Sequence, residues 1–177
     1  MPSPSEFYST ILPAKYQEAL STADASLREQ SELTVNYEIS SDEIHGLRTK
    51  GGELEYTAGG IENPDMYTRI QRDAWDSSIG EGDMDPLLDY VLRRKVSAVK
   101  ALKGTVRLEL DRSNGSQYTS ETTFGSANEP NVTLMMSTDD YKAMVRGELD
   151  GQMAFMLGKL KFDGSLPLLM AIGALTS

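Results

Sequence analysis

The segment that most constrains the fold runs from Asn131 to Leu175, because strand, helix, strand and apolar helix patterns follow one another there with almost no linker. Val132, Leu134 and Met136 occupy alternate positions, which predicts a strand with one well-buried face. Six of the nine methionines lie in this segment, so flexible apolar side chains are concentrated in it. The pattern predicts a mixed α+β structure with an apolar interior.

A helix is expected to follow this strand. Ser137 and Thr138 offer N-cap hydroxyl groups, and Asp139 and Asp140 place carboxylates in the first turn, where free backbone amides and the helix dipole favour them. Paired carboxylates can also serve acid and base chemistry, but at the start of a helix they are far more often caps. The apolar stripe of this helix comprises Tyr141, Met144, Val145 and Leu149.

Two further elements complete the segment. After a short apolar turn over 153–157, residues 158–164 alternate apolar and basic side chains, which predicts a strand with one solvated face. Ser165 can cap a final helix that has Pro167 in its first turn. From 166 to 175 this helix is apolar on every side, so it must be buried, cover a cavity, or meet a partner or a membrane. Glycines near both of its ends would let it move as a cover.

The rest of the chain is read from the same kinds of pattern. We expect a helix over 7–29, strands over 33–40, 66–70 and 105–111, a hairpin over 47–56, and helices over 73–79 and 85–102. Asp85 would cap the long helix, and Asn114 with Gly115 indicates a type I′ hairpin turn. His45, the only histidine, lies in a polar stretch that is typical of a turn.

Composition excludes several classes of protein. A net charge of -10 and a pI near 4.6 disfavour a general nucleic-acid binder and a strongly anionic membrane surface. The chain contains no cysteine, and neither a zinc nor a calcium ligand pattern is present. No nucleophile motif accompanies the single histidine. We therefore predict no catalytic residue, no metal, no cofactor and no enzymatic activity. The N-terminus does not resemble a secretory signal, which favours a cytoplasmic location.

The segment 131–173 resembles the sterol carrier protein type 2 family. The resemblance rests on VTLMMSTDDYKAMVRGEL, the apolar MAFMLGKLKFDG that follows, and the apolar terminal helix, which stand in family order. It implies a sterol carrier protein-like fold, in which a mostly antiparallel sheet covered by helices encloses an apolar cavity. It also implies that the protein binds and transfers sterols, fatty acids or related lipids without catalysis.

The two halves of the chain also resemble each other. TVNYE from Thr34 is similar to TVRLE from Thr105, and residues 62–75 are similar to residues 128–141, with Pro64 over Pro130. This suggests a degenerate internal repeat, although any two α+β segments share a few such positions. We expect residues 1–84 to form an accessory or degenerate repeat unit, residues 85–177 to form the lipid-binding unit, and both to build one compact domain.

The residues alone are more typical of an ordinary core than of a ligand cavity, but the resemblance turns the apolar and Met-rich positions into candidate lipid-binding residues. The predicted lining is Leu134, Met136, Tyr141, Met144, Val145, Met153, Phe155, Met156, Leu160, Phe162, Leu166, Leu169, Met170 and Ile172. The expected partner is a hydrophobic small molecule or lipid, with transient membrane contact and the oligomeric state left open. Two alternatives stand beside this hypothesis: an accessory protein or enzyme of lipid or natural-product metabolism that uses the same cavity, and an interaction module that docks through its C-terminal helix.

Overall fold

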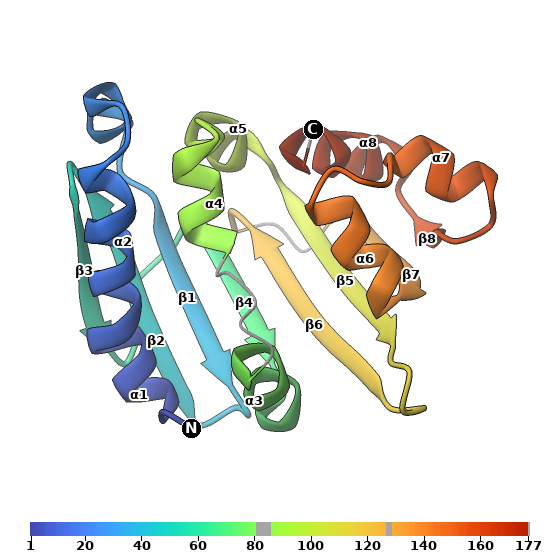
Figure 1. Cartoon of the computed structure of the whole chain (residues 1–177), viewed down its shortest axis with the longest axis horizontal. Coiled ribbons are helices and arrows are strands. Elements are labelled where there is room, and N and C mark those ends of the chain that lie inside the picture. Colours follow the sequence, from blue (N-terminus) through green and yellow to red (C-terminus); the bar gives the residue numbers. More distant parts are fainter. Residues whose placement is uncertain (81–85, 127–128, 177) are drawn as a thin grey trace.

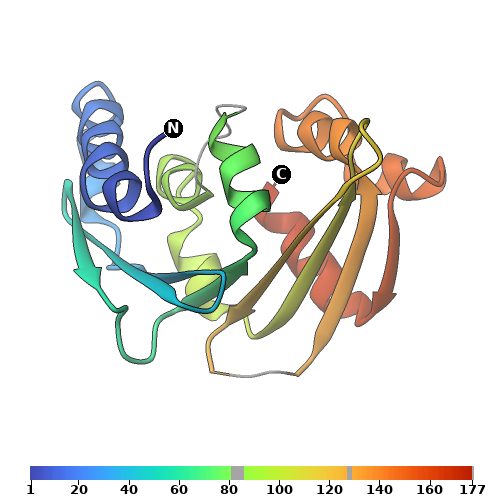
Figure 2. The ribbon, with the colours of Figure 1, turned by 90° about the horizontal axis from the view of Figure 1, so that it is seen from below.

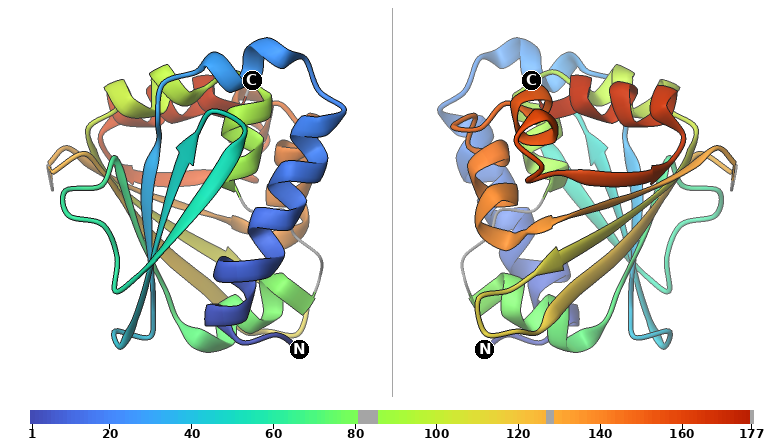
Figure 3. Two further views of the ribbon diagram at one scale, coloured as in Figure 1. Left: turned by 90° about the vertical axis from the view of Figure 1, so that its left-hand side faces the viewer. Right: turned by 90° about the vertical axis from the view of Figure 1, so that its right-hand side faces the viewer.

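A computed structural model describes residues 1–80, 86–126 and 129–176. Its centre is one eight-stranded sheet with the strand order β3-β2-β1-β4-β6-β5-β7-β8. The helices lie on one side of this sheet, and the other side is left open (Figures 1 and 3). Among the described strands, five of the seven pairings are antiparallel, which confirms the predicted α+β class and the mostly antiparallel sheet.

Each element follows a local pattern in the chain. The strands are β1 (Thr34–Ile39), β2 (Glu43–Lys50), β3 (Glu53–Ala58), β4 (Met66–Ile70), β5 (Gly104–Asp111), β6 (Gln117–Phe124), β7 (Asn131–Ser137) and β8 (Lys161–Gly164). The helices are α1 (Pro4–Glu6), the π-helical η1 (Phe7–Ile11), α2 (Leu12–Ser21), the 3₁₀ helix η2 (Ala25–Glu29), α3 (Arg72–Gly80), α4 (Pro86–Leu92), α5 (Val96–Ala101), α6 (Thr138–Val145), α7 (Gly151–Met156) and α8 (Leu166–Thr176).

The same pairing pattern occurs twice in the sheet. In the first half, β1 pairs antiparallel with β2 and parallel with β4, and α3 follows β4. In the second half, β5 pairs antiparallel with β6 and parallel with β7, and α6 follows β7. The halves join where β4 pairs antiparallel with β6. Figure 2 shows the two groups side by side, with the N-terminal helices and β1–β3 at one end and α6–α8 at the other.

Two apolar clusters lie between the sheet and its helices. The first is built on β1–β4 and the helices up to α5, and the second is built on β5, β7, α7 and α8. Between them, the hydroxyl groups of Thr68 and Thr122 meet at 2.9 Å on neighbouring strands. Leu102 and Val106 pack against both clusters, so the interior is continuous at these two side chains.

The predicted helix over 85–102 is wrong in its middle. The chain forms α4 and α5, separated by residues 93–95, and Arg94 adopts a left-handed conformation with φ of 59°. The amides of Arg94 and Lys95 donate to the carbonyls of Val91 and Tyr90, which closes α4. The Arg94 side chain reaches Asp24 at 3.1 Å, so a tertiary contact accompanies the break. The predicted cap at Asp85 lies outside the described residues.

Three further local predictions need correction. The helical run at the N-terminus begins at Pro4 and contains a π-helical stretch before Pro13, because proline has no N–H to donate to the preceding turn. The turn at Asn114 is not type I′, since only Gly115 has a positive φ; it is a three-residue hairpin loop. The apolar residues after 150 form helix α7 rather than a turn, because the Asp150 carboxylate caps it.

The prediction that His45 lies in a turn is also wrong. His45 lies inside β2 with 4% of its surface exposed. The turn itself is shorter and lies before Glu43. At this position the side chain points into the first cluster instead of into water.

Candidate functional site

The second cluster begins with a row of apolar side chains across the sheet. Leu108 on β5 lies beside Leu134 on β7, which lies beside Phe162 on β8. Because side chains alternate between the faces of a strand, these three point to the same side. Leu134 is 9% exposed, and Leu108 and Phe162 are partly buried. The row forms an apolar floor that faces the helices.

Helix α6 is positioned over this floor by its cap. The Ser137 hydroxyl accepts from the Asp140 amide at 3.1 Å, as the sequence predicts. The Asp140 carboxylate in turn accepts from the Lys159 ammonium at 2.9 Å. Hydrogen bonds from Lys159 and Ser137 lower the pKa of Asp140, with the charge of Lys159 adding to the effect. The start of α6 is therefore tied to the loop before β8.

Helices α7 and α8 close the cluster from the other side. Ala154 on α7 is fully buried, and Leu168 on α8 is 3% exposed in the same cluster. At its far end, α8 places Leu175 in the first cluster with 2% exposure. The Lys95 ammonium donates to the Ala174 carbonyl at 3.0 Å, beside this anchor. Helix α8 thus spans both clusters and is held at both ends.

The fourteen predicted lining residues divide into three groups. Leu134, Met136 and Leu160 are buried. Tyr141, Met144, Phe162, Leu169 and Ile172 are partly buried and pack against the second cluster. Val145, Met153, Phe155, Met156, Leu166 and Met170 are exposed. The structure therefore brings eight of them together around one interior and places six on the surface of the same region.

Sequence reasoning missed several members of the cluster. Leu110, Val132, Ala154 and Leu168 are buried in it, and Leu108 and Tyr118 pack against it. The alternation along β5 and β7 would have pointed to Leu108, Leu110 and Val132, whose Cα partners lie in register. Nothing in the sequence indicated that Ala154 is buried, because a small residue among larger apolar ones does not reveal which side of a helix is covered.

The apolar row on the sheet continues to one exposed side chain. The rings of Phe162, at the end of the row, and Phe155, on α7, lie 5.6 Å apart and are tilted against each other. Phe155 is 53% exposed. Phe155 therefore extends the apolar contacts of the row to the surface of the molecule.

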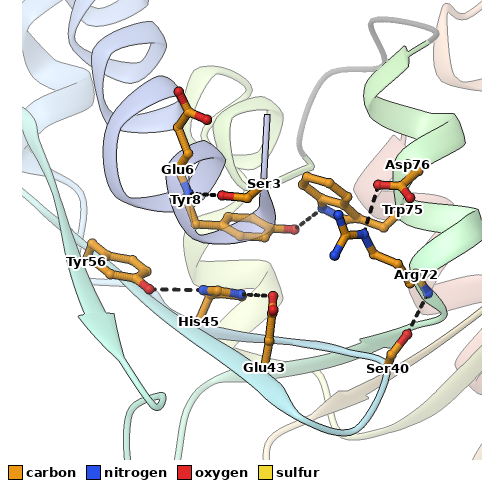
Figure 4. Close-up of polar contacts among 10 residues, drawn as sticks. All are labelled: Ser3, Glu6, Tyr8, Ser40, Glu43, His45, Tyr56, Arg72, Trp75 and Asp76. Carbon is orange, nitrogen blue, oxygen red and sulfur yellow. Dashed lines mark hydrogen bonds and ion pairs between the residues drawn. The ribbon is translucent and has the colours of Figure 1, made fainter. Parts of the chain in front are cut away.

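The first cluster is packed differently. Tyr8 stacks on Tyr37 and on His45. Its hydroxyl accepts from the Trp75 indole N–H at 3.1 Å (Figure 4). Tyr8, Tyr37 and Trp75 are each 2% exposed. These large rings fill the space between the N-terminal helices, the sheet and α3.

His45 makes one hydrogen-bonding contact in this cluster, to the Tyr56 hydroxyl at 3.0 Å from Nδ1 (Figure 4). Its Nε2 lies 3.6 Å from the Glu43 carboxylate, which is beyond hydrogen-bonding distance, and is otherwise without a partner among the described residues. Burial lowers the pKa of His45, and Glu43 partly opposes this shift. No serine nucleophile contacts the ring in the described part of the chain, so this contact set offers no hydrolytic arrangement.

The open face of the sheet is polar. A shallow hollow of about 180 Å³ is lined by charged and hydroxyl side chains of β1, β4, β5 and β6. Arg69 lies 3.3 Å from Glu38 and 3.4 Å from Glu121 across its floor. Burial, reinforced by Glu38, raises the pKa of Tyr67 to about 12. Such a surface does not suit an apolar ligand, which leaves the helix-covered face as the candidate site.

Comparison with known proteins assigns the chain to a family. Residues 87–177, slightly more than half of the 177-residue chain, match the model of the SCP-2 sterol transfer family. The chain belongs to the SCP-2 sterol transfer family. The match covers α4, α5, the whole second half of the sheet and α6–α8, so every element of the second cluster lies within the SCP-2 region.

Several known proteins are similar to parts or all of this chain. Peroxisomal multifunctional enzyme A of Dictyostelium discoideum is 36% identical over 77 residues, which make up 44% of this chain and 17% of that protein. This SCP-2 chain therefore spans less than a fifth of that relative. Sterol carrier protein 2 from Yarrowia lipolytica, in its apo form, is 22% identical, with a TM-score of 0.33, 41% of this chain covered and 65% of that chain. A ubiquinone synthesis protein, UbiJ-SCP2, is 9% identical, with a TM-score of 0.32, 99% of this chain covered and 93% of that chain.

The described residues offer neither a membrane-spanning helix nor a metal-binding cluster. None of the described helices is long and apolar enough to cross a membrane. The described part of the chain brings no three histidine, aspartate or glutamate side chains together in a way that could hold a metal ion.

Proposed function

We propose that this protein binds a hydrophobic lipid and transfers it without chemical change, and that the second cluster holds the ligand. The observation that carries this proposal is the unbroken series of apolar side chains from exposed Phe155 through Phe162 to Leu134. Membership of the SCP-2 sterol transfer family supports it independently. Removal of apolar ligand surface from water, at about 25 cal/mol per Å², would supply the affinity.

The packing of the two clusters supports the choice of the second. Tyr8, Tyr37 and Trp75 fill the first cluster with rings that contact one another. In the second cluster, seven buried side chains are surrounded by ten that are only partly buried. Met144 is one of the latter, and its unbranched thioether can repack around ligands of different shape.

Charges near the second cluster favour a lipid with an uncharged or singly charged head group. The Lys159 ammonium is paired with Asp140, and the Arg146 guanidinium is paired with Glu148 at 2.9 Å. Each cation thus already has a carboxylate partner, and a multiply charged head group would have to compete for it. We expect a free fatty acid or sterol to bind better than an acyl coenzyme A thioester. A competition titration in which the thioester displaces the matching fatty acid more strongly at low salt would contradict this.

We further infer that residues 85–177 form the lipid-binding unit and that residues 1–84 are a degenerate copy of it. The repeated strand pairing supports a duplication, as do α3 and α6, which follow β4 and β7 directly. Trp75 and Tyr141, at equivalent places, face their respective clusters. In this interpretation, aromatic side chains fill the part of the first unit that corresponds to the ligand site of the second.

One matched pair of substitutions tests the ligand site. Met144→Gln places an amide against the second cluster, and Met66→Gln places the same amide in the first cluster, where Met66 is 3% exposed. Poor solvation of the amide by a bound lipid costs about 0.5 to 3 kcal/mol, so Met144→Gln should weaken binding of a fluorescent fatty acid by about 2- to 140-fold. Met66→Gln should lower the stability and leave the affinity unchanged.

Two results would contradict the proposal. If Met66→Gln lowers the affinity and Met144→Gln does not, the ligand lies in the first cluster. If the wild-type chain binds neither fatty acid nor sterol and native mass spectrometry of the purified protein reveals no lipid, lipid binding itself is wrong.

A further inference from the structure

Exposed apolar side chains are concentrated at one end of the molecule. Seven of the eight large apolar side chains that are exposed in the described part of the chain lie between Val145 and Met170. Figure 1 shows α7, which carries three of them, at the outer end of the molecule near β8, and α8, which carries two more, running from β8 toward the middle. We call Met153, Phe155, Met156, Leu157, Leu166 and Met170 the C-terminal apolar face; their exposed fractions run from 50% to 72%. Exposed apolar surface gathered in this way marks an interaction site.

The face carries no charge. Neither α7 nor α8 contains an acidic or basic residue, and the same is true of Leu157 and Gly158, which follow α7. Leu166, Met170 and Ala174 are spaced four apart on the exposed side of α8. Both helices have an inner side as well, since Ala154 and Leu168 are buried. The exposed residues are therefore the outer sides of well-packed helices and are not displaced core.

The charge of the chain is distributed away from this face. Residues 1–130 contain 22 acidic and 13 basic side chains, a net charge of -9, whereas residues 131–177 contain 5 and 4, a net charge of -1. The part of the chain around the apolar face is thus almost neutral. A strongly anionic surface would repel the rest of the molecule, while an electrically neutral surface would not.

The composition of the face distinguishes a lipid surface from a protein partner. Protein interfaces are also enriched in methionine and phenylalanine, but they carry about one hydrogen bond per 100–200 Å² and need polar side chains to make them. The C-terminal apolar face offers methionine, leucine and one phenylalanine, with Gln152 as the exposed polar side chain between them on α7. A bilayer surface accepts inserted apolar side chains and requires no hydrogen bonds from them.

We propose that the C-terminal apolar face docks on the surface of a bilayer of zwitterionic phospholipid, with the acidic remainder of the chain turned away. The purpose of this docking rests on the proposed lipid binding, because Phe155 belongs to the face and its ring lies against Phe162 of the second cluster. A lipid that leaves the bilayer at this point would reach the second cluster without crossing water.

Vesicle flotation with the full chain tests the proposal. Wild-type protein should float with vesicles of pure phosphatidylcholine, should float no better when phosphatidylglycerol is added, and should not be released by salt. The double variant Met156→Glu/Met170→Glu should reduce the vesicle-bound fraction about tenfold or more, because an ionised side chain is costly to place in lipid. The control Gln17→Glu/Thr57→Glu adds the same charge at exposed positions on α2 and β3 and should float like wild type.

Each other outcome would overturn the proposal. No flotation of the wild type, flotation that requires the anionic lipid, or an equal loss in the control variant would each do so. If sedimentation reveals a dimer that the Met156→Glu/Met170→Glu variant dissociates while vesicles remain unbound, the face joins two copies of the chain. Binding of a fluorescent fatty acid in solution separates the two proposals. If the wild type binds it but does not float, docking alone fails, and if it does not bind it, the proposed function fails whatever the vesicles show.

Discussion

The anchoring of α8 leads to a quantitative prediction about two residues of one helix. Leu175 is 2% exposed in the first cluster, whereas Met170, five residues earlier, is 68% exposed. Replacing a buried leucine by alanine costs about 2 to 5 kcal/mol, and an exposed substitution changes the stability by at most about 0.5 kcal/mol. In a chain of this size, 1 kcal/mol shifts the melting temperature by about 2 to 4 °C. Leu175→Ala should therefore lower Tm by about 4 to 20 °C, and Met170→Ala by no more than about 2 °C.

Thermal unfolding followed by circular dichroism measures both shifts in the unliganded protein. Leu168→Ala serves as a second buried comparison, since Leu168 is 3% exposed at the other end of α8 in the second cluster. If Leu175→Ala shifts Tm as little as Met170→Ala does, the end of α8 is not anchored, and the helix is free to swing as the cover that the sequence suggested. A large shift for Leu175→Ala means that any opening must occur without lifting the helix as a whole.

Three further predictions concern packing and pH. Gly104→Ala should destabilise the protein by more than about 1 kcal/mol in urea unfolding, because the new Cβ would lie 2.4 Å from the Pro130 carbonyl oxygen at a φ of 131°; an unchanged midpoint would refute this. Burial lowers the pKa of His45, so the unfolded chain binds its proton more readily, and the free energy of unfolding should fall as the pH drops below about 6.5. His45→Gln should show a smaller fall over the same range, and an identical pH profile would show that other groups cause it. Trp75→Phe removes the hydrogen bond to the Tyr8 hydroxyl and should cost about 1 kcal/mol or more without changing lipid affinity in a binding titration.

Much of the architecture could be predicted because it depends on short-range patterns. Alternation located β1, β4, β5 and β7, and the Ser137 cap located the start of α6. The glycines at 51 and 52 located the hairpin between β2 and β3. In each case the residues that define the element lie within it or directly beside it, so the prediction needs no knowledge of contacts with distant parts of the chain.

The predictions fail where a contact between residues far apart in the sequence determines the local structure. Arg94 and Lys95 lie in a pattern that reads as continuous helix, and the break after α4 comes with the reach of Arg94 to Asp24, seventy residues away. His45 looked solvent-exposed because its neighbours in the chain are polar, but the stacking partner Tyr8 comes from the N-terminal helix. Likewise, the candidate lining was chosen for apolar character, and this could not separate Leu134, which faces inward, from Met156, which faces out. Which side of a helix is covered depends on where its neighbours pack.

The pairing of β4 with β6 has a consequence for dissecting the chain. Five residue pairs, from Met66 with Phe124 to Ile70 with Ser120, connect the two halves of the sheet. Cutting the chain between residues 84 and 85 would strip β6 of these partners and leave a row of unsatisfied amides and carbonyls along a strand rich in threonine. Such an open edge recruits strands from other molecules, so the isolated fragment 85–177 should aggregate, or dimerise through β6, when it is produced alone. The N-terminal half would then prevent the second half from associating with other chains through β6, a role that requires no ligand of its own.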